Sequence, residues 1–129
     1  MNPAAERKLY PEIAFRVEPQ RVASFRSIFG IDRGVPPTFV TAAEFAVMPR
    51  IVEDPELGLD FTRVLHASQE YELHRPLREG ESLSVRARID SIRQRGATGF
   101  LTIMMELVDD EGVVVCTARS MMVERGADA

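Results

Sequence analysis

The chain has little of the chemistry that many enzymes rely on. Its 129 residues include one cysteine, Cys116, which excludes an internal disulfide. The neighbours Val115 and Thr117 are typical of a strand and favour a structural thiol over a nucleophile. The two histidines, His66 and His74, occur without nearby cysteines or an H-x-x-E pattern. We therefore expect no metal site and no cofactor.

Positive charge is also limited. The chain has 16 basic residues against 20 acidic ones, a formal net charge of -4, and Lys8 as its one lysine. This balance argues against a nucleic-acid binder. P-loop, G-x-G-x-x-G and G-x-S-x-G motifs are missing. No apolar run is long enough to span a membrane, and MNPAAERKLYPE lacks a signal core, so we expect a cytoplasmic protein.

Apolar residues make up 45% of the chain, enough to form one hydrophobic core. We predict a single domain over residues 1–129 with its core at about 10–123. Residues 10–17 alternate as a first strand does, and Pro19 and Gly30 bracket a helix. In this helix Val22, Phe25 and Phe29 predict a surface helix with one buried stripe.

The segment 35–49, VPPTFVTAAEFAVMP, is bounded by prolines and apolar on nearly every side. This pattern predicts a buried helix that ends at Pro49, and its small alanines would let a sheet approach closely. Residues 51–63 contain Pro55 and Gly58 and predict an irregular connection.

Four strand-length segments follow with almost nothing between them. The first begins at Val64, and a turn with Gly80 leads to residues 83–92, where Ile92 breaks the alternation and predicts a bulge. Residues 101–107 and 113–123 form the last two strands around a DDEG turn, and 125–129 form a polar tail. Helices first and an antiparallel meander afterwards predict an α+β domain, a sheet wrapped around one apolar helix.

Several of these stretches resemble a known family. PPTF at 36–39 resembles the start of the central helix in MaoC-like dehydratase N-terminal domains. VLHASQEYELHRPLREGESL at 64–83 resembles that family's H-x-x-Q, strand, H-[RK]-P and G-[DE]-x-L. The resemblance implies a hot-dog fold and a subunit of an (R)-specific enoyl thioester hydratase or 3-hydroxyacyl thioester dehydratase. It also implies acyl thioesters of coenzyme A or acyl carrier protein as substrates, and a dimer with the acyl tunnel at its interface.

One departure from the family concerns its catalytic dyad. Catalytic members carry Asp-x4-His in the loop before the central helix, whereas IDRGV at 31–35 contains Asp32 and no histidine. Asp60 and His66 are separated by five residues instead of four and belong to another element. Three alternatives stay open: a silent subunit paired with a dyad-bearing hot-dog partner, a self-sufficient homodimeric hydro-lyase or thioesterase, and a non-catalytic acyl-thioester binder.

Glu44 is the first candidate catalytic residue. It lies in the apolar run AAEFA, where burial would raise its pKa toward the range of a general base. Two other interpretations compete with this one. Thr41-x-x-Glu44 is also a capping-box pattern, which would expose Glu44 in a first turn, and Glu44 could instead pair with an arginine at an interface.

His66 is the second candidate catalytic residue, because the start of its strand could meet the central helix or a dimer partner. The alternative is a histidine bonded to a loop carbonyl. Strand parity places His66 and His74 on the same face of the strand as Ser68, Glu70 and Glu72. A second set of side chains points to the opposite face. These opposite residues are Leu65, Ala67, Tyr71 and Leu73.

Substrate contacts are predicted at two places. A backbone N–H of Thr38 or Phe39, at the start of the central helix, could bind a thioester oxygen, whereas Pro37 has no N–H. Arg86 and Arg88, the first arginines of the densest basic patch, with those at 93 and 95, could hold coenzyme A phosphates or an acidic carrier protein. The competing interpretation is a solvated strand face.

Overall fold

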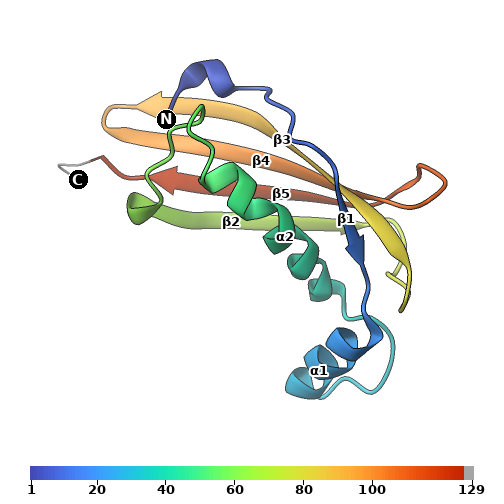
Figure 1. Cartoon of the computed structure of the whole chain (residues 1–129). Helices are drawn as coiled ribbons and strands as arrows, with labels where there is room; N and C mark the ends of the chain where they lie inside the picture. The colour runs from blue at the N-terminus through green and yellow to red at the C-terminus, as the bar shows by residue number, and fades with distance from the viewer. Residues whose placement is uncertain (127–129) are drawn as a thin grey trace.

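The computed structural model describes residues 1–126, and in it a curved antiparallel sheet wraps around one long helix (Figure 1). The strands are β1 (Ile13–Arg16), β2 (Val64–Leu73), β3 (Ser82–Arg95), β4 (Thr98–Val108) and β5 (Val114–Glu124). The helices are α1 (Pro19–Phe29) and α2 (Val40–Val52). Short 3-10 turns are η1 (Pro3–Ala5), η2 (Pro37–Phe39) and η3 (Phe61–Arg63).

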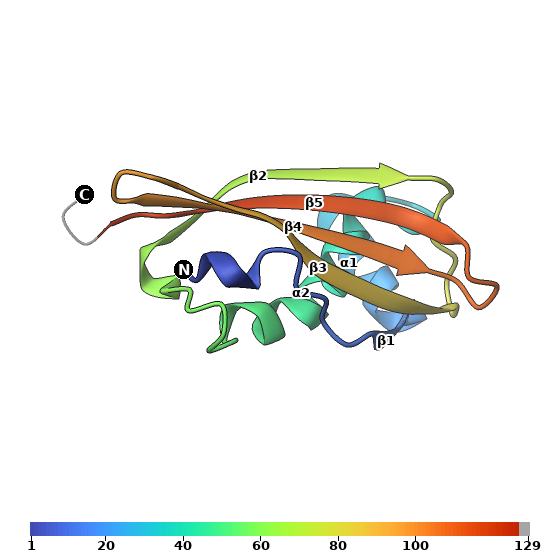
Figure 2. The same cartoon turned by 90° about the horizontal axis from the view of Figure 1, so that it is seen from above.

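The strand order is β1-β3-β4-β5-β2. Strands β3, β4 and β5 form the predicted meander, whereas β2 pairs with β5 and not with its chain neighbour β3. This order places β1 and β2 at the two edges of the sheet. Figure 2 shows both helices on one face of the sheet, so the other face is not covered by any element of residues 1–126.

Alternation in the sequence correctly identified the inner face of the central strands. Four β4 side chains at every second position are at most 2% exposed: Leu101, Ile103, Met105 and Leu107. The predicted bulge is confirmed, because the β3–β4 register shifts between Ile89 and Ser91. The extra residue returns Ile92 to the inner side, opposite Leu101. The buried cluster also includes Ala5, which precedes the expected start of the core.

Helix α2 differs from its prediction in two ways. It continues through Pro49 to Val52, and it is not buried on every side, because Phe45 is 63% exposed. Proline removes the bond to the carbonyl four residues earlier, which here belongs to Phe45. Since both residues are exposed, water can bond to that carbonyl and the helix can continue. The buried face consists of Val40, Ala43, Glu44, Val47 and Ile51.

Helix α1 ends at Gly30, which has a φ of 66°, as the sequence predicted. The predicted buried stripe is wrong over its second half. Val22 is fully buried, but Ile28 is 76% and Phe29 60% exposed. Figure 1 shows the reason: α1 extends below the sheet, so its last turns have no strand to pack against.

The N-terminal segment is held to the loop after α2 by charge. Lys8 Nζ donates to Asp54 at 2.7 Å and to Glu56 at 2.6 Å, and the Tyr10 hydroxyl donates to Asp54 at 2.7 Å. Of the predicted polar tail, residues 127–129 lie outside the described residues. Within residues 1–126 no helix is both long and apolar enough to cross a membrane.

The close approach of α2 to the sheet is testable with two alanines of the same helix. Ala43 is 0% exposed and Ala46 is exposed. We expect Ala43→Leu to lower the free energy of unfolding by about 1–3 kcal/mol, because a core without spare volume cannot accept a larger side chain. Ala46→Leu should change it by less than about 0.5 kcal/mol. Urea unfolding at one protein concentration measures both, and equal effects would contradict tight packing at Ala43.

Candidate functional site

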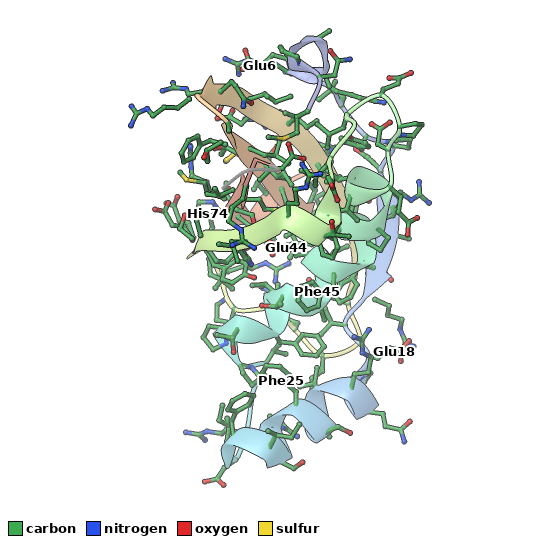
Figure 3. The ribbon with its side chains drawn as sticks, turned by 90° about the vertical axis from the view of Figure 1, so that its left-hand side faces the viewer. Glu6, Glu18, Phe25, Glu44, Phe45 and His74 are labelled. Carbon is green, nitrogen blue, oxygen red and sulfur yellow. The ribbon has the colours of Figure 1, made fainter. Side chains whose placement is uncertain are left out.

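Polar side chains from α2 and β2 meet on the inner side of the sheet. Gln69 Nε2 donates to Glu44 Oε2 at 2.9 Å, and the Tyr71 hydroxyl lies 3.5 Å from Glu44 Oε1. Tyr71 also shares a 2.8 Å hydrogen bond with the Thr41 hydroxyl, one turn earlier on α2. Figure 3 shows Glu44 on the side of α2 that faces β2. Both helix residues are therefore bound to one edge strand.

Glu44 is only 2% exposed, so the capping-box interpretation is wrong. Helix α2 begins at Val40 with no side-chain cap, and Glu44 faces inward one turn later. Burial is the main cause that raises the pKa of Glu44 above its usual 4.5, opposed by the bonds from Gln69 and Tyr71 and by the nearby His66. The raised pKa favours the neutral carboxyl.

The parity prediction for His66 is wrong. The β2–β5 register shifts between His66 and Ser68, so the face that each residue occupies changes at Ala67. His66 consequently points to the inner side, where its Nε2 lies 3.0 Å from the buried Ser120 hydroxyl. Within residues 1–126 this hydroxyl is its hydrogen-bond partner, rather than the loop carbonyl weighed as the alternative. His66 nevertheless stays exposed, because nothing in residues 1–126 covers it.

Sequence analysis did not single out three members of this site, Gln69, Tyr71 and Ser120. Gln69 was visible as the last position of H-x-x-Q, and alternation places it on the face of Tyr71, but nothing in the sequence indicated that α2 brings Glu44 to that face. Gln69 Oε1 is buried and has no hydrogen-bond partner within residues 1–126. Buried acceptors normally have a donor, so this oxygen lacks one. Ser120, 1% exposed in a mostly apolar strand, was detectable only by its burial.

The remaining candidate residues are not gathered around Glu44. The Phe39 N–H donates to the Pro36 carbonyl at 2.9 Å within η2, which leaves Thr38 as the predicted thioester donor. His74 is exposed, with its Nε2 3.4 Å from the Thr117 hydroxyl.

Arg86 and Arg88 lie on the face of β3 away from the helices. Arg86 is ion-paired with Glu12, and Arg88 lies 3.8 Å from Asp90 and 4.0 Å from Glu106. The structure therefore separates these two arginines from the Glu44 cluster by the thickness of the sheet.

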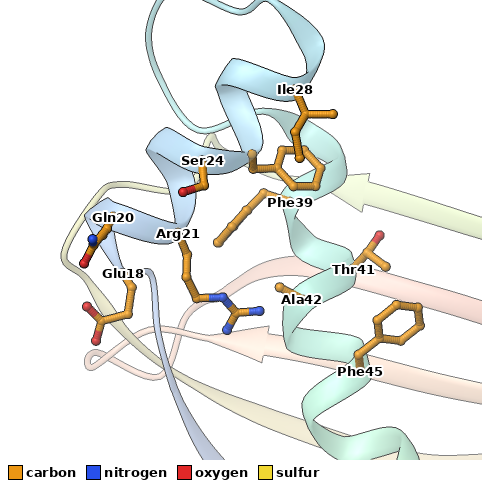
Figure 4. A pocket seen from close by; sticks show the side chains of 10 residues that line it. Glu18, Gln20, Arg21, Ser24, Ile28, Phe39, Thr41, Ala42 and Phe45 are labelled. Atoms are coloured by element: carbon orange, nitrogen blue, oxygen red, sulfur yellow. The ribbon is translucent and has the colours of Figure 1, made fainter.

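A groove of about 690 Å³ runs between α1 and the first half of α2 (Figure 4). Its walls are mainly apolar, with Phe25 and Phe39 in an edge-to-face contact at 5.6 Å between ring centres. Thr41 links it to the polar cluster, because this residue lines the groove and bonds to Tyr71. The lining residues are Glu18, Gln20, Arg21, Ser24, Phe25, Ile28, Phe39, Thr41, Ala42 and Phe45.

Two other chemistries find little support in the described part of the chain. Residues 1–126 contain no group of three or more His, Cys, Asp or Glu side chains that could hold a metal ion. Cys116 is fully buried, and burial raises its thiol pKa to about 11. A thiol that stays protonated at neutral pH is a poor nucleophile.

A five-stranded sheet around one helix, with a polar cluster under its edge strand, defines a hot-dog domain. Solved structures agree: the HadBC complex of Mycobacterium tuberculosis, a (3R)-hydroxyacyl-ACP dehydratase, has a TM-score of 0.78 at 19% identity and covers 92% of this chain and 96% of that one. A MaoC-like dehydratase has a TM-score of 0.80 at 22% identity, over 97% of this chain and 43% of that one. The predicted fold is thereby confirmed.

The sequence comparison is more specific. Residues 17–118 match the model of the FAS1-like dehydratase domain region, and the chain belongs to this family. A UPF0336 protein of Saccharopolyspora erythraea is 44% identical over 91 residues, 70% of this chain and 58% of the relative. One from Leifsonia xyli is 33% identical over 114 residues, 88% of this chain and 73% of the relative. The chain spans about three fifths of the length of several relatives, 58% to 62%.

The raised pKa of Glu44 predicts a pH dependence of stability. A carboxyl whose pKa is higher folded than unfolded stabilises fully below its unfolded pKa, and the contribution is lost as pH rises through the folded pKa. We expect Glu44→Gln, which cannot ionise, to gain stability relative to the parent protein as pH rises from 4.5 upward. Urea unfolding of both proteins at several pH values measures the difference. Parallel pH curves would show that Glu44 ionises as freely as in the unfolded chain.

Proposed function

We propose that this chain is a subunit of a hot-dog enzyme that hydrates 2-enoyl thioesters or dehydrates 3-hydroxyacyl thioesters, and that a second hot-dog chain supplies the acid–base pair. One observation carries this proposal. The loop between α1 and α2 holds Asp32 but no histidine, and both histidines lie instead at the ends of β2. Membership in a dehydratase-region family supports the reaction class. We keep a cytoplasmic location as part of the proposal.

Glu44 is better suited to holding the fold than to catalysis in this chain. A general base must be ionised and must reach its substrate. The Glu44 carboxyl is 2% exposed and already contacts Gln69 and Tyr71, so it is not open to a substrate. Its proximity to His66 favours a second candidate, a self-sufficient hydro-lyase or thioesterase, which a partner could complete by covering His66.

The edge strand β2 is the place where a partner hot dog would bind. This ten-residue strand has β5 as a neighbour on one side only, and long unpaired edges invite a further strand. Large apolar side chains are exposed on β2 and on the elements near it: Leu65 at 53%, Phe61 at 60% and Phe45 at 63%. Two similar structures, HadBC and the ChsH1–ChsH2 complex of Mycobacterium tuberculosis, bear the names of two-component complexes. These features support either a heterodimer or a homodimer.

The groove between α1 and α2 offers space for the acyl group. Phe25, Phe39 and Phe45 give it an apolar wall, and an alkyl chain gains free energy from leaving water. Thr41 lines the groove and bonds to Tyr71 of the polar cluster, so the cluster lies beside the groove. The thioester end of a bound acyl group would therefore lie toward β2 and the partner.

The reaction is tested by hydration of a trans-2-enoyl-CoA by the purified protein alone. We expect the background rate, because the chain lacks an acid–base pair open to substrate, while a saturated acyl-CoA still binds in a calorimetric titration. Glu44→Gln and His66→Ala are measured alongside. Turnover in the parent that either variant loses would replace the silent-subunit proposal with the self-sufficient one.

The partner surface is tested with two side chains of equal exposure. Leu65 on β2 is 53% exposed, and Val113, in the β4–β5 turn, is 54% exposed. We expect Leu65→Glu to shift the assembly, either the homodimer or the complex with the co-purified partner chain, toward a smaller species in size-exclusion chromatography with light scattering, because a charge would be buried in the contact. Val113→Glu should leave the mass of the assembly unchanged. Dissociation by both variants, or by neither, would argue against β2 as the interface.

A further inference from the structure

The uncovered face of the sheet holds a second cavity, of about 600 Å³, that the proposed function does not use. Four guanidinium groups line it, from Arg7 in the N-terminal segment, Arg93 and Arg95 at the end of β3, and Arg119 on β5. The one carboxylate in the lining is Asp90. For a chain with a net charge of -4, this concentration of positive charge is unusual.

The arginines are gathered but not neutralised. Asp90 lies 3.6 Å from Arg7, 3.8 Å from Arg119 and 3.8 Å from Arg88, and none of these contacts is a hydrogen bond. Arg93 and Arg95 take part in no ion pair within residues 1–126. A loosely shared carboxylate holds the group together and leaves most guanidinium N–H groups free to donate to a ligand.

Arg7 reaches this cavity at a conformational cost. Its φ is 71°, and it is the one non-glycine residue with a positive φ in residues 1–126. The backbone is fixed there because the Arg7 N–H donates to the Ile89 carbonyl at 3.0 Å, next to the bulge that contains Asp90. Glycine would adopt this conformation without strain, so an arginine at this position indicates a use for its side chain.

An unpartnered hydroxyl lies among these arginines. Thr102 lines the cavity, is only 7% exposed and takes part in no side-chain hydrogen bond within residues 1–126. Its hydroxyl oxygen is not closed off from solvent, so it is open to the cavity and can donate to a ligand atom. Phe100 and Met121 add an apolar surface beside it. A solvated strand face, the competing interpretation, does not need the positive φ of Arg7.

We propose that this cavity binds an anion with two adjacent phosphate groups, as in a nucleoside diphosphate. Planar guanidinium groups match phosphate oxygens two at a time, and the Thr102 hydroxyl can donate to one more. Phe100 offers a ring surface for a base. The site is separate from the groove between α1 and α2: it lies on the other face of the sheet, near the β3–β4 turn, at the opposite end from α1 (Figures 1 and 2).

Calorimetric titration of the intact protein with ADP and with inorganic pyrophosphate tests the proposal. We expect both to bind, more weakly as salt concentration rises, and the doubly substituted Arg93→Gln/Arg119→Gln protein to bind at least about tenfold more weakly. Arg50→Gln, an exposed arginine on α2, is the matched control and should bind like the parent. Thr102→Val keeps the shape and should weaken binding about two- to tenfold.

The two anions distinguish the possible sources of the phosphates. Tighter binding of ADP than of pyrophosphate, reduced to the pyrophosphate level by Phe100→Leu, identifies a nucleotide site, whereas equal binding identifies a site for the phosphates alone. An unchanged melting temperature without ligand shows that each variant is folded. Failure of both anions to bind, or equal binding by the parent and the double variant, would overturn the proposal. The readout is binding of the free anions and not turnover, so failure here leaves the hydration test of the proposed function unaffected.

Discussion

The packing of α2 against the inner face of the sheet is the constraint on which the rest of the structure depends. The helix lies close to the strands because Ala43 is small and fully buried. The same approach buries Glu44, which would be costly without partners. Gln69 and Tyr71 supply those partners from β2, so the polar cluster follows directly from the helix packing.

The arrangement leaves the domain incomplete at one edge. Strand β2 contributes Gln69 and Tyr71 to the buried cluster, yet its outer edge is unpaired and Leu65 and His66 remain exposed. A monomer that ended there would expose apolar surface and strand edge together, a combination that natural proteins avoid. The family and the fold indicate a dehydratase-type domain, and this edge is where the proposed second subunit would bind.

The two faces of the sheet differ in chemistry. The inner face carries the helices, the apolar groove and a carboxyl whose pKa is raised by burial. The outer face carries arginines that share too few carboxylates to be neutralised. Because strand side chains alternate between faces, β3 builds both environments, with Ala87 and Ile89 inside and Arg86 and Arg88 outside.

Most of the secondary-structure elements and the fold class could be predicted from the sequence. Alternating side chains in β4, the glycine that ends α1 and the bulge before Ile92 were all visible in it, because each follows from local geometry. Two local expectations failed, the end of α2 at Pro49 and the buried second half of α1, because exposure to water depends on neighbouring elements. Which residues meet was likewise decided only by the tertiary structure. The register shift after His66 placed this residue on the opposite face from Ser68, Glu70 and Glu72, and the tertiary structure brought Arg119 and Arg7 to Asp90. A one-residue shift moves every following side chain to the other face, and contacts between distant segments depend on strand order, which local periodicity does not specify.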